Sequence, residues 1–351
     1  MERTVTVDGR IIGSGQPCYF MAEVAGNFTT EQEAVRIVDS AVRAGADAVK
    51  FQTLDPQTIT TKSNRFDMAA AGTRRQYDLF AEAQTPTELQ LFLVDYCRQK
   101  GVTAFSAPSH LKDLELMAKF DSPAYKIGSD LATHIPLLIE IAKTGKAIFL
   151  STGMCTMAEV EESLEAIYAT GNDRVLLLHC VADYPGLAEE QNLKAMVAMK
   201  KKFGCPVGFS DHTIGLDVSC AALALGAELI ERHYWCEGNT EGVDRGISSD
   251  ENEFRRLVEA SRRISAVLGD GVKRPSPHEL RNMKTNKISI IVMESIAAGT
   301  VLEESMIDIR RPGYGLAPKL WKQVVGKRVL MDLEAEQPLE SHHVHWTNEG
   351  P

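Results

Sequence analysis

The feature that most constrains this fold is a pattern that occurs eight times: a short apolar strand, a polar turn and an amphipathic helix. The predicted strands are Tyr19–Val24, Ala48–Gln52, Thr103–Ser106, Ala124–Ile127, Ala147–Ser151, Val175–His179, Val207–Ser210 and Glu228–His233. The predicted helices span residues 31–44, 86–100, 111–119, 134–144, 156–169, 190–203, 215–225 and 250–268. Strands that alternate with helices pair in parallel, and eight of them can close a barrel. The sequence therefore predicts an α/β fold, a (β/α)8 TIM barrel.

A doubly wound open sheet is the competing topology, but its usual glycine-rich turn after the first strand is missing from Val24–Asn27. Two local signals support the helix assignments. Thr85 precedes Pro86, which suits a cap followed by proline at the first helical position. Thr156 and Glu159 have the spacing of a capping box. We therefore favour the barrel.

The pattern changes near residue 270, where Gly269–Pro277 is a turn-rich exit from the barrel. After a short helical piece, strand-like runs at Ile288–Met293 and Val329–Leu333 indicate a small domain that is mainly β. Within the barrel, the long polar segment 53–85 is of the kind that covers active sites. We predict a barrel domain over residues 1–275, a linker over 276–286 and the small domain over 287–351.

Composition narrows the class of protein. The net charge is −10 without a long run of Lys and Arg, so we expect no nucleic-acid partner. No apolar run is long enough to cross a bilayer, and residues 1–5 lack the apolar segment of a signal peptide. We therefore expect a cytoplasmic protein with no membrane contact. The seven cysteines show no CxxC spacing, so we expect free thiols.

Two lysines interrupt apolar strands, Lys50 in the second and Lys126 in the fourth. A lysine in a barrel mouth needs a negative partner or must lose its proton. Ion pairing with Glu23 is one interpretation, and a Schiff-base aldolase lysine is another. Two ammonium groups beside strand-end hydroxyls would instead bind the phosphate and the carboxylate of one small ligand, which we favour. The hydroxyl groups belong to Ser129, Ser151 and Ser210.

Two histidines, His212 and His233, end the neighbouring seventh and eighth strands. Their imidazoles could converge on one ion, and with water and a carboxylate they suit Mn²⁺, Fe²⁺ or Zn²⁺. Glu231 would share the face of His233 in a regular strand, whereas Asp211 would point away from that of His212. Asp244, in the loop after the eighth strand, is close enough to join as a ligand or a base.

In these and further segments the chain resembles the sialic acid synthase family, the phosphoenolpyruvate-dependent N-acetylneuraminate, legionaminate and pseudaminate synthases. The resemblance covers nearly the full length. The segments that carry it are Ala22–Glu23, Ala44–Thr53, Tyr125–Ser129, Leu150–Met154, His179–Cys180, Tyr184–Pro185, Pro206–Gly215, Ala224–Ala227, Glu231–His233, Leu268–Pro275 and Arg311–Gly315.

This resemblance implies a C-terminal antifreeze-like (SAF) domain, swapped across a homodimer to cover the partner's barrel mouth. The residues that it implies for phosphoenolpyruvate are Lys50, Lys126, Ser129, Ser151 and Ser210. It places His212 and His233 on a divalent metal, Mn²⁺ first, with Mg²⁺ or Co²⁺ as alternatives. The residues that it implies for the acceptor sugar are Glu23, Gln52, Tyr184, Asp244 and the partner's Arg311.

The implied reaction condenses phosphoenolpyruvate with an N-acylated hexosamine, such as N-acetylmannosamine, and releases phosphate. C3 of phosphoenolpyruvate attacks the open-chain aldehyde, which the metal polarises, and water then adds at C2. Glu23 is a candidate base for that water, while Lys50 and Lys126 stabilise the charge of the phosphate and carboxylate.

Several positions depart from the neuraminate-synthase pattern. The residues that stand there instead are Phe28, Ala107, Leu131, Ala182 and Arg245. The changes cluster around the substrates, whereas both lysines and both histidines remain. A different acceptor sugar is the first explanation, and weakened or lost activity is the second.

Two other functions stay open. One is a class I pyruvate aldolase, which predicts a pyruvyl adduct on Lys126 that borohydride traps. The other is a degenerate barrel whose C-terminal domain binds glycans, which predicts binding that survives chelation and His212→Ala.

Overall fold

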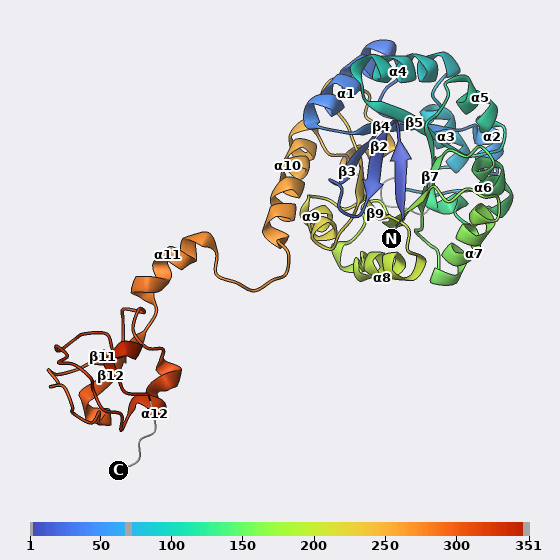
Figure 1. Ribbon diagram of the computed structural model, residues 1–351. Coiled ribbons are helices and arrows are strands. Elements are labelled where there is room, and N and C mark those ends of the chain that lie inside the picture. Colours follow the sequence, from blue (N-terminus) through green and yellow to red (C-terminus); the bar gives the residue numbers. More distant parts are fainter. Residues whose placement is uncertain (1–2, 67–71, 347–351) are drawn as a thin grey trace. The chain divides into compact units, whose positions relative to one another are not determined.

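The computed structural model of the chain describes residues 3–66 and 72–346 (Figure 1). It divides into two compact units, Met1–Gly269 and Asp270–Pro351. In the first unit a ring of helices surrounds the strands (Figure 1). The strands are β3 (Tyr19–Glu23), β4 (Ala48–Thr53), β5 (Thr103–Pro108), β6 (Ala124–Ile127), β7 (Ala147–Ser151), β8 (Val175–Cys180), β9 (Val207–Asp211) and β10 (Leu229–His233). The helices are α1 (Glu31–Ala44), α4 (Thr87–Lys100), α5 (Asp113–Lys119), α6 (Ile135–Ala142), α7 (Met157–Tyr168), α8 (Lys194–Phe203), α9 (Asp217–Ala224) and α10 (Glu251–Leu268).

The strands lie in the order β5-β4-β3-β10-β9-β8-β7-β6, and every ladder between them is parallel. The two strands at the ends of this order, β5 and β6, are in contact, so the sheet curls into a near-closed barrel. Both strands are described in full, and no ladder joins them. The predicted (β/α)8 fold is confirmed.

Local start signals were predicted with mixed success. The capping box of Thr156 and Glu159 is present at the start of α7. The cap expected from Thr85 is wrong, because Pro86 stays extended and α4 begins one residue later without a side-chain cap. The carbonyl of Thr85 instead accepts a hydrogen bond from the side chain of Gln90, at 2.7 Å.

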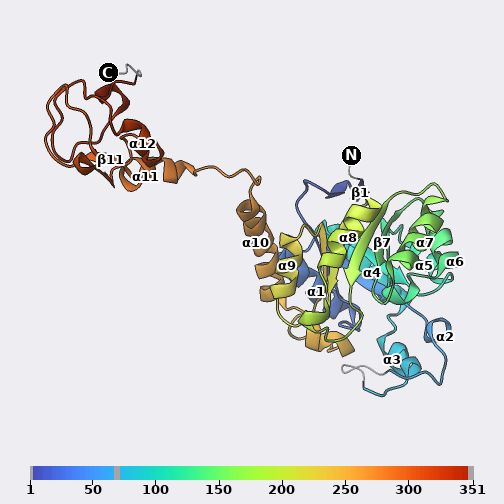
Figure 2. The same ribbon diagram turned by 90° about the horizontal axis from the view of Figure 1, so that it is seen from below.

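A short N-terminal hairpin, which the sequence interpretation missed, closes one end of the barrel. Its strands β1 (Thr4–Val7) and β2 (Arg10–Gly13) turn at Asp8 and Gly9, whose φ angles are 47° and 75°. Val5, Val7 and Ile12 join the apolar cluster inside the barrel. Figure 2 shows β1 at one end of the barrel and α2 and α3 at the other.

The helices α2 (Pro56–Ile59) and α3 (Gln76–Ala83) belong to the long segment 53–85 that follows β4. Residues 67–71 of this segment lie outside the described part of the chain.

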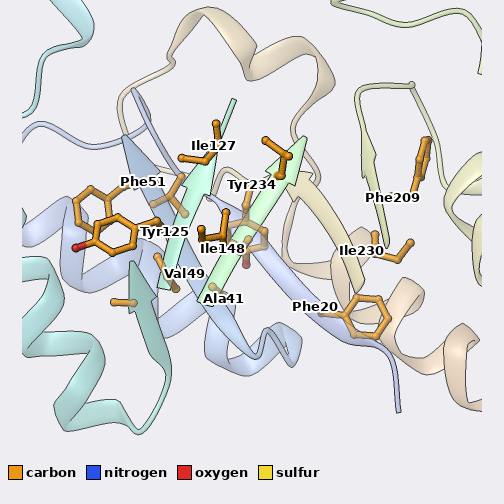
Figure 3. Close-up of a cluster of buried hydrophobic side chains, with 14 of the residues drawn as sticks. Phe20, Ala41, Val49, Phe51, Tyr125, Ile127, Ile148, Phe209, Ile230 and Tyr234 are labelled. Carbon is orange, nitrogen blue, oxygen red and sulfur yellow. The ribbon is translucent and has the colours of Figure 1, made fainter. Parts of the chain in front are cut away.

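The larger apolar core lies between strands and helices, where Val49, Ile148 and Ile230 project from the outer face of the strands (Figure 3). The strand interior is therefore left to the other set of alternate residues.

The second unit has its own small core. Its elements are α11 (Pro277–Asn286), β11 (Ser289–Val292), β12 (Ile307–Arg310) and α12 (Trp321–Val324), with β11 and β12 antiparallel. The strand expected at Val329–Leu333 is wrong: both end residues are buried, at 1% and 2% exposure, but they make only isolated bridges. The chain bends between them, so their spacing reflects burial and not a strand.

Two expectations from composition can be compared with the structure. All seven cysteines are free thiols, as predicted. In residues 3–66 and 72–346, no helix has the length and apolar character needed to cross a membrane.

Candidate active site at the carboxyl end of the barrel

The carboxyl ends of the strands direct the predicted polar residues into the barrel interior. Alternate residues of a strand face opposite sides of the sheet. On β10, Leu229 belongs to the apolar cluster inside the barrel, so Glu231 and His233 face the interior too. The same alternation turns inward Glu23 on β3, Lys50 on β4, Lys126 on β6 and Ser151 on β7. Ser210 on β9 pairs with Glu231 and shares its face.

Two lysines and two glutamates form a buried cluster in this interior. Lys50 pairs with Glu23, and its Nζ also lies 3.5 Å from Oε1 of Glu231. Nζ of Lys126 lies 2.8 Å from Oε2 of Glu231. None of the four side chains is more than 5% exposed. The ion pair with Glu23 that the sequence allowed is thus present, and Glu231 is shared by both ammonium groups.

Burial and pairing determine the protonation of this cluster. Burial opposes the charge on Glu231, but the ammonium groups of Lys126 and Lys50 outweigh it and lower the pKa of Glu231. Burial also opposes the charge on Lys50, whose pKa Glu23 and Glu231 nevertheless raise. Complete burial raises the pKa of Glu23 despite Lys50, and Glu231 adds to the rise. Glu23 is therefore the carboxylate of the cluster that gains a proton most readily.

Hydroxyl groups line the same end of the barrel. Oγ of Ser129 accepts a hydrogen bond from the backbone N–H of Gly153, at 3.0 Å. A Cβ at Gly153 would lie 2.8 Å from that oxygen, so only glycine permits this approach. Oγ of Ser151 is buried without a hydrogen-bond partner. A buried hydroxyl left unpaired costs free energy, which suits a group that meets a ligand.

The two histidines lie side by side at the ends of β9 and β10, with ring centroids 5.4 Å apart. Nδ1 of His212 donates to the carbonyl of Val181, at 2.9 Å. The ring of Tyr184 lies 4.1 Å from that of His212, centroid to centroid. Nδ1 of His233 is buried without a hydrogen bond, and Oδ2 of Asp244 lies 3.6 Å from it.

Charge and burial act differently on the two imidazoles. Burial lowers the pKa of His233 well below its ordinary value, and the charges of His212 and the lysines add to this. His233 is thus neutral, the form that binds metals. Burial also opposes a proton on His212, but the thiol of Cys180 and the carbonyl of Val181 raise its pKa. Sγ of Cys180 lies 3.8 Å from Nδ1 of His212.

These donors fit a divalent metal. The unpartnered Nδ1 of His233 and the nearby carboxylate of Asp244 supply the nitrogen and oxygen that such ions accept. Over the described ranges, no three His, Cys, Asp or Glu side chains form a ligand set by themselves. A metal here would therefore take further ligands from water or substrate, as open catalytic sites do.

Asp244 lies in a 3₁₀ turn, Val243–Ile247, that follows β10. The buried Asn27 holds this loop: its Nδ2 donates to the carbonyl of Tyr234 at 2.9 Å, and its Oδ1 accepts from the N–H of Gly242 at 3.1 Å. Burial raises the pKa of Asp244, against the pull of His212 and Lys50.

Gln52 and Arg311 are the two remaining residues predicted to contact the sugar. Gln52 is half-buried near the end of β4 and pairs in register with Ala107. Arg311 belongs to the second unit, where its side chain is exposed directly before Pro312. Both assignments therefore stay predictions.

Sequence reasoning missed the part that Glu231 plays. It placed Glu231 on the face of His233 but left it out of the predicted site, although the structure makes it the partner of both lysines. The signal was available, since Glu23 and Lys50 follow the same alternation. Two of the atypical positions have structural roles: Phe28 is buried in the core, and Arg245 lies over the ring of Trp235, 3.8 Å from its centroid.

Fold and site together define a class: a (β/α)8 barrel with a buried charged cluster at the carboxyl ends of its strands, joined to a small β domain. Comparison with protein families identifies it further. The NeuB family matches residues 37–273, and the SAF domain matches residues 289–344. The chain belongs to the NeuB family and carries a SAF domain at its C-terminal end.

Its relatives include named synthases. A pseudaminic acid synthase of Campylobacter jejuni is 33% identical over 90% of this chain and 93% of the relative. An N,N'-diacetyllegionaminic acid synthase of Legionella pneumophila is 31% identical over 95% and 96%. The crystal structure of an N-acetylneuraminic acid synthetase from Leptospira borgpetersenii, in complex with citrate, shares 28% identity. It has a TM-score of 0.71 and covers 81% of this chain and 96% of its own.

Proposed function

We propose that the chain is a nonulosonic acid synthase, which condenses phosphoenolpyruvate with an N-acylated hexosamine and releases phosphate. The observation that carries this proposal is the pair of buried ammonium groups beside an unpartnered serine hydroxyl and two adjacent imidazoles. The names of the relatives support the same class of product.

Phosphoenolpyruvate carries a phosphate and a carboxylate, and the cluster offers one ammonium group for each. Glu23 and Glu231 pair with Lys50 and Lys126, so both side chains are held in place before the anion binds. Charge-assisted hydrogen bonds to an anion are about twice as strong as neutral ones. The hydroxyl groups available to share in this binding belong to Ser129, Ser151 and Ser210.

His212 and His233, with Asp244 beside them, would hold the divalent metal, with Mn²⁺ as the first candidate. A metal bound there would act as a Lewis acid on the aldehyde of the open-chain sugar. Tyr184 restricts the ring of His212 by packing against it, and burial raises the pKa of Tyr184, so its phenol remains a hydrogen-bond donor for the sugar.

In the reaction, C3 of phosphoenolpyruvate forms a bond to the aldehyde carbon, and C2 becomes an oxocarbenium-like centre. Water adds at C2, and the C2–O bond to phosphate then breaks with the electron pair leaving on phosphate. Glu23 takes one proton of that water, and the other leaves as the C2=O bond forms and phosphate departs. The former aldehyde oxygen takes up a proton and becomes a hydroxyl group. Burial raises the pKa of Glu23, so its ionised form is a stronger base than an exposed glutamate.

The proposal includes a homodimer in which the SAF domain of one subunit covers the barrel of the other. Two large apolar side chains in the loops after β7 and β9 support a covering partner, since Met154 is 72% exposed and Ile214 is 73% exposed. Exposed apolar surface of this kind is typical of interaction sites. In such a dimer the partner's Arg311 would reach the acceptor sugar.

The aldolase alternative fits the structure less well. A Schiff-base lysine needs its Nζ free to attack a carbonyl, yet Nζ of Lys126 is engaged by a buried carboxylate, 2.8 Å from Oε2 of Glu231.

The full chain tests the proposal. We expect phosphate release only when phosphoenolpyruvate, an N-acylated hexosamine and a divalent ion are all present. Mass spectrometry should find a product whose mass is that of the acceptor plus pyruvic acid. A panel of mannosamine, bacillosamine-derived and altrose-type acceptors would identify the sugar. The absence of phosphate release with the whole panel and with Mn²⁺, Mg²⁺ and Co²⁺ would contradict the proposal, whereas a borohydride-trapped adduct on Lys126 would support the aldolase.

A further inference from the structure

A buried polar network lies on the outer face of β9 and β10, behind the two histidines. Asp211 and Arg232 pair in register between these strands, and neither side chain is more than 2% exposed. Because side chains alternate across a strand, both point away from the interior that His212 and His233 face. Neither residue can therefore touch a substrate in the barrel mouth.

Asp211 fixes the turn that follows β9. Its Oδ1 accepts hydrogen bonds from the backbone N–H of Thr213 at 2.8 Å and from the hydroxyl of Thr213 at 2.7 Å. Its Oδ2 accepts from the hydroxyl of Ser219, on α9, and from Arg232. These bonds hold both chain neighbours of His212, so they restrict the backbone from which its imidazole projects.

Arg232 ties the two histidine segments together. Its Nη2 donates to the carbonyl of Thr213 at 3.0 Å, and its Nε donates to the hydroxyl of Ser249 at 2.9 Å. The backbone N–H of Ser249 in turn donates to the carbonyl of His233 at 2.8 Å. One planar guanidinium thus holds the residue after His212 and, through Ser249, the backbone of His233.

Stability alone is a poor explanation for this pair. The cost of removing two charges from water offsets most of their attraction, so apolar replacements of buried ion pairs are often neutral or stabilising. The bonds made by Asp211 and Arg232 instead converge on the residues next to His212 and His233. Partners behind metal ligands typically change metal affinity about 10–100-fold when they are removed.

We infer that Asp211 and Arg232 are positioning residues that set the spacing and orientation of His212 and His233 for one divalent cation. This inference rests on the proposed function to the extent that it takes the two histidines as metal ligands. It assigns the buried pair a role in metal affinity and not in the chemical step.

The same two strands supply a matched control at their other end. Glu228, directly before β10, is 7% exposed and bridges to β9 by accepting from the N–H of Val207 at 2.8 Å. Its other carboxylate oxygen accepts from Ser14 and Lys200, both at 2.9 Å. Glu228 is thus also a buried, fully bonded carboxylate between β9 and β10, but it lies at the end away from the histidines.

The test compares Arg232→Lys, Asp211→Asn and Glu228→Gln in the full chain. Lysine keeps the charge but has no planar fork to reach both Thr213 and Ser249. Mn²⁺ binding is measured without substrates, by the electron paramagnetic resonance signal of the free ion, together with the melting temperature. We expect Kd for Mn²⁺ to rise about 10–100-fold in the first two variants. In Glu228→Gln we expect a lower melting temperature and an unchanged Kd.

Each outcome decides the inference. Wild-type Kd in both Arg232→Lys and Asp211→Asn would overturn it and leave the proposed function intact. Equal weakening in Glu228→Gln would also overturn it, because general destabilisation would then explain the loss. A wild-type chain that binds neither Mn²⁺, Mg²⁺ nor Co²⁺ removes the histidine metal site of the proposed function, and this inference with it. If Arg232→Lys and Asp211→Asn fail to fold, Ser249→Ala removes one partner of Arg232 alone, and a Kd equal to the wild-type value would then refute the positioning role.

Discussion

The two ends of the barrel interior use the same strands for opposite purposes. On β10, Leu229 packs in the apolar cluster with Val5, Val7 and Ile12 of the hairpin, whereas Glu231 and His233 further along carry charge and an unpartnered nitrogen. The amino end is filled by apolar side chains, whereas the carboxyl end holds paired charges together with buried polar atoms that lack a hydrogen bond, such as Oγ of Ser151 and Nδ1 of His233. On β10, the inward-facing residue Leu229 packs in the apolar core, and the next inward-facing residue, Glu231, already belongs to the charged site.

The difference is one of free energy as well as composition. Apolar groups buried at the amino end stabilise the fold in proportion to the area removed from water. Charges buried at the carboxyl end lose hydration that their ion pairs only partly return. In (β/α)8 barrels the carboxyl end holds the active site and the amino end contributes stability. Variants at the two ends should therefore separate activity from stability.

The largest effect is expected from Lys126→Ala. The change removes one of the two ammonium groups and leaves Glu231 with Lys50 alone. We expect kcat/KM for phosphate release to fall about 10³-fold, as when one preorganised electrostatic group is removed from an active site. Steady-state kinetics measure it, and Glu228→Gln provides the amino-end control, with kcat/KM within about twofold of the wild-type value. Similar losses in both variants would break the distinction between the ends.

A smaller loss, about 10²-fold in kcat/KM, is expected from Glu23→Gln, because it removes the candidate base. The pKa of Glu23 is raised above its ordinary value of 4.5 by burial. In the wild type, kcat/KM should fall as pH drops through this raised pKa, because the base becomes protonated. The variant should lack that acidic limb in its pH–rate profile. An unchanged limb would assign the base to another residue.

The raised pKa of Glu23 also makes the stability of the fold depend on pH, in a direction that can be stated. A carboxyl group with a raised pKa in the folded state stabilises the fold below its ordinary pKa, and this stabilisation is lost as pH rises through the raised value. Thermal unfolding of Glu23→Gln across that range should therefore depend less on pH than unfolding of the wild type does.

The smallest effect is expected at the amino end, from Ile12→Val. Ile12 is fully buried among the hairpin and barrel residues. Removal of one methylene should lower the free energy of unfolding by about 1 kcal/mol. Chemical denaturation measures this change, and kcat/KM should stay at the wild-type value. A loss of activity without a loss of stability would show that the hairpin acts on the carboxyl end.

The sequence was a good guide to the barrel because its period is set by burial. The prediction for α1, residues 31–44, agrees with the structure at both ends, and the other helices differ by a few residues. The hairpin was missed although Asp8 and Gly9 form a typical turn pair, because its strands are only four residues each. Val329–Leu333 misled because buried apolar residues in an irregular segment can mimic a strand.

The candidate site was predictable as far as the ends of the strands locate it. Positions at strand ends placed Lys50, Lys126 and His233 at the mouth of the barrel, but they give no distances between strands. The sharing of Glu231 by both lysines depends on the curvature of the whole sheet, which no local pattern records. The network of Asp211 and Arg232 likewise depends on register between two strands that are separate in sequence.

The missing ladder between β5 and β6 makes the barrel a rolled sheet with one seam. The rings of Phe105 on β5 and Phe149 on β7 pack against each other, with centroids 5.3 Å apart. Side-chain contacts therefore join the two sides of the barrel where no backbone ladder does. Local opening of the barrel should begin between β5 and β6, because no backbone hydrogen bonds hold these strands together. Backbone amides of β5 and β6 should exchange with solvent earlier than those of β9 and β10. Lys126 lies on β6, one of these two strands. Of the two lysines, Lys126 is the one whose strand has a hydrogen-bonded neighbour on one side only, so we expect its backbone to move more than that of Lys50.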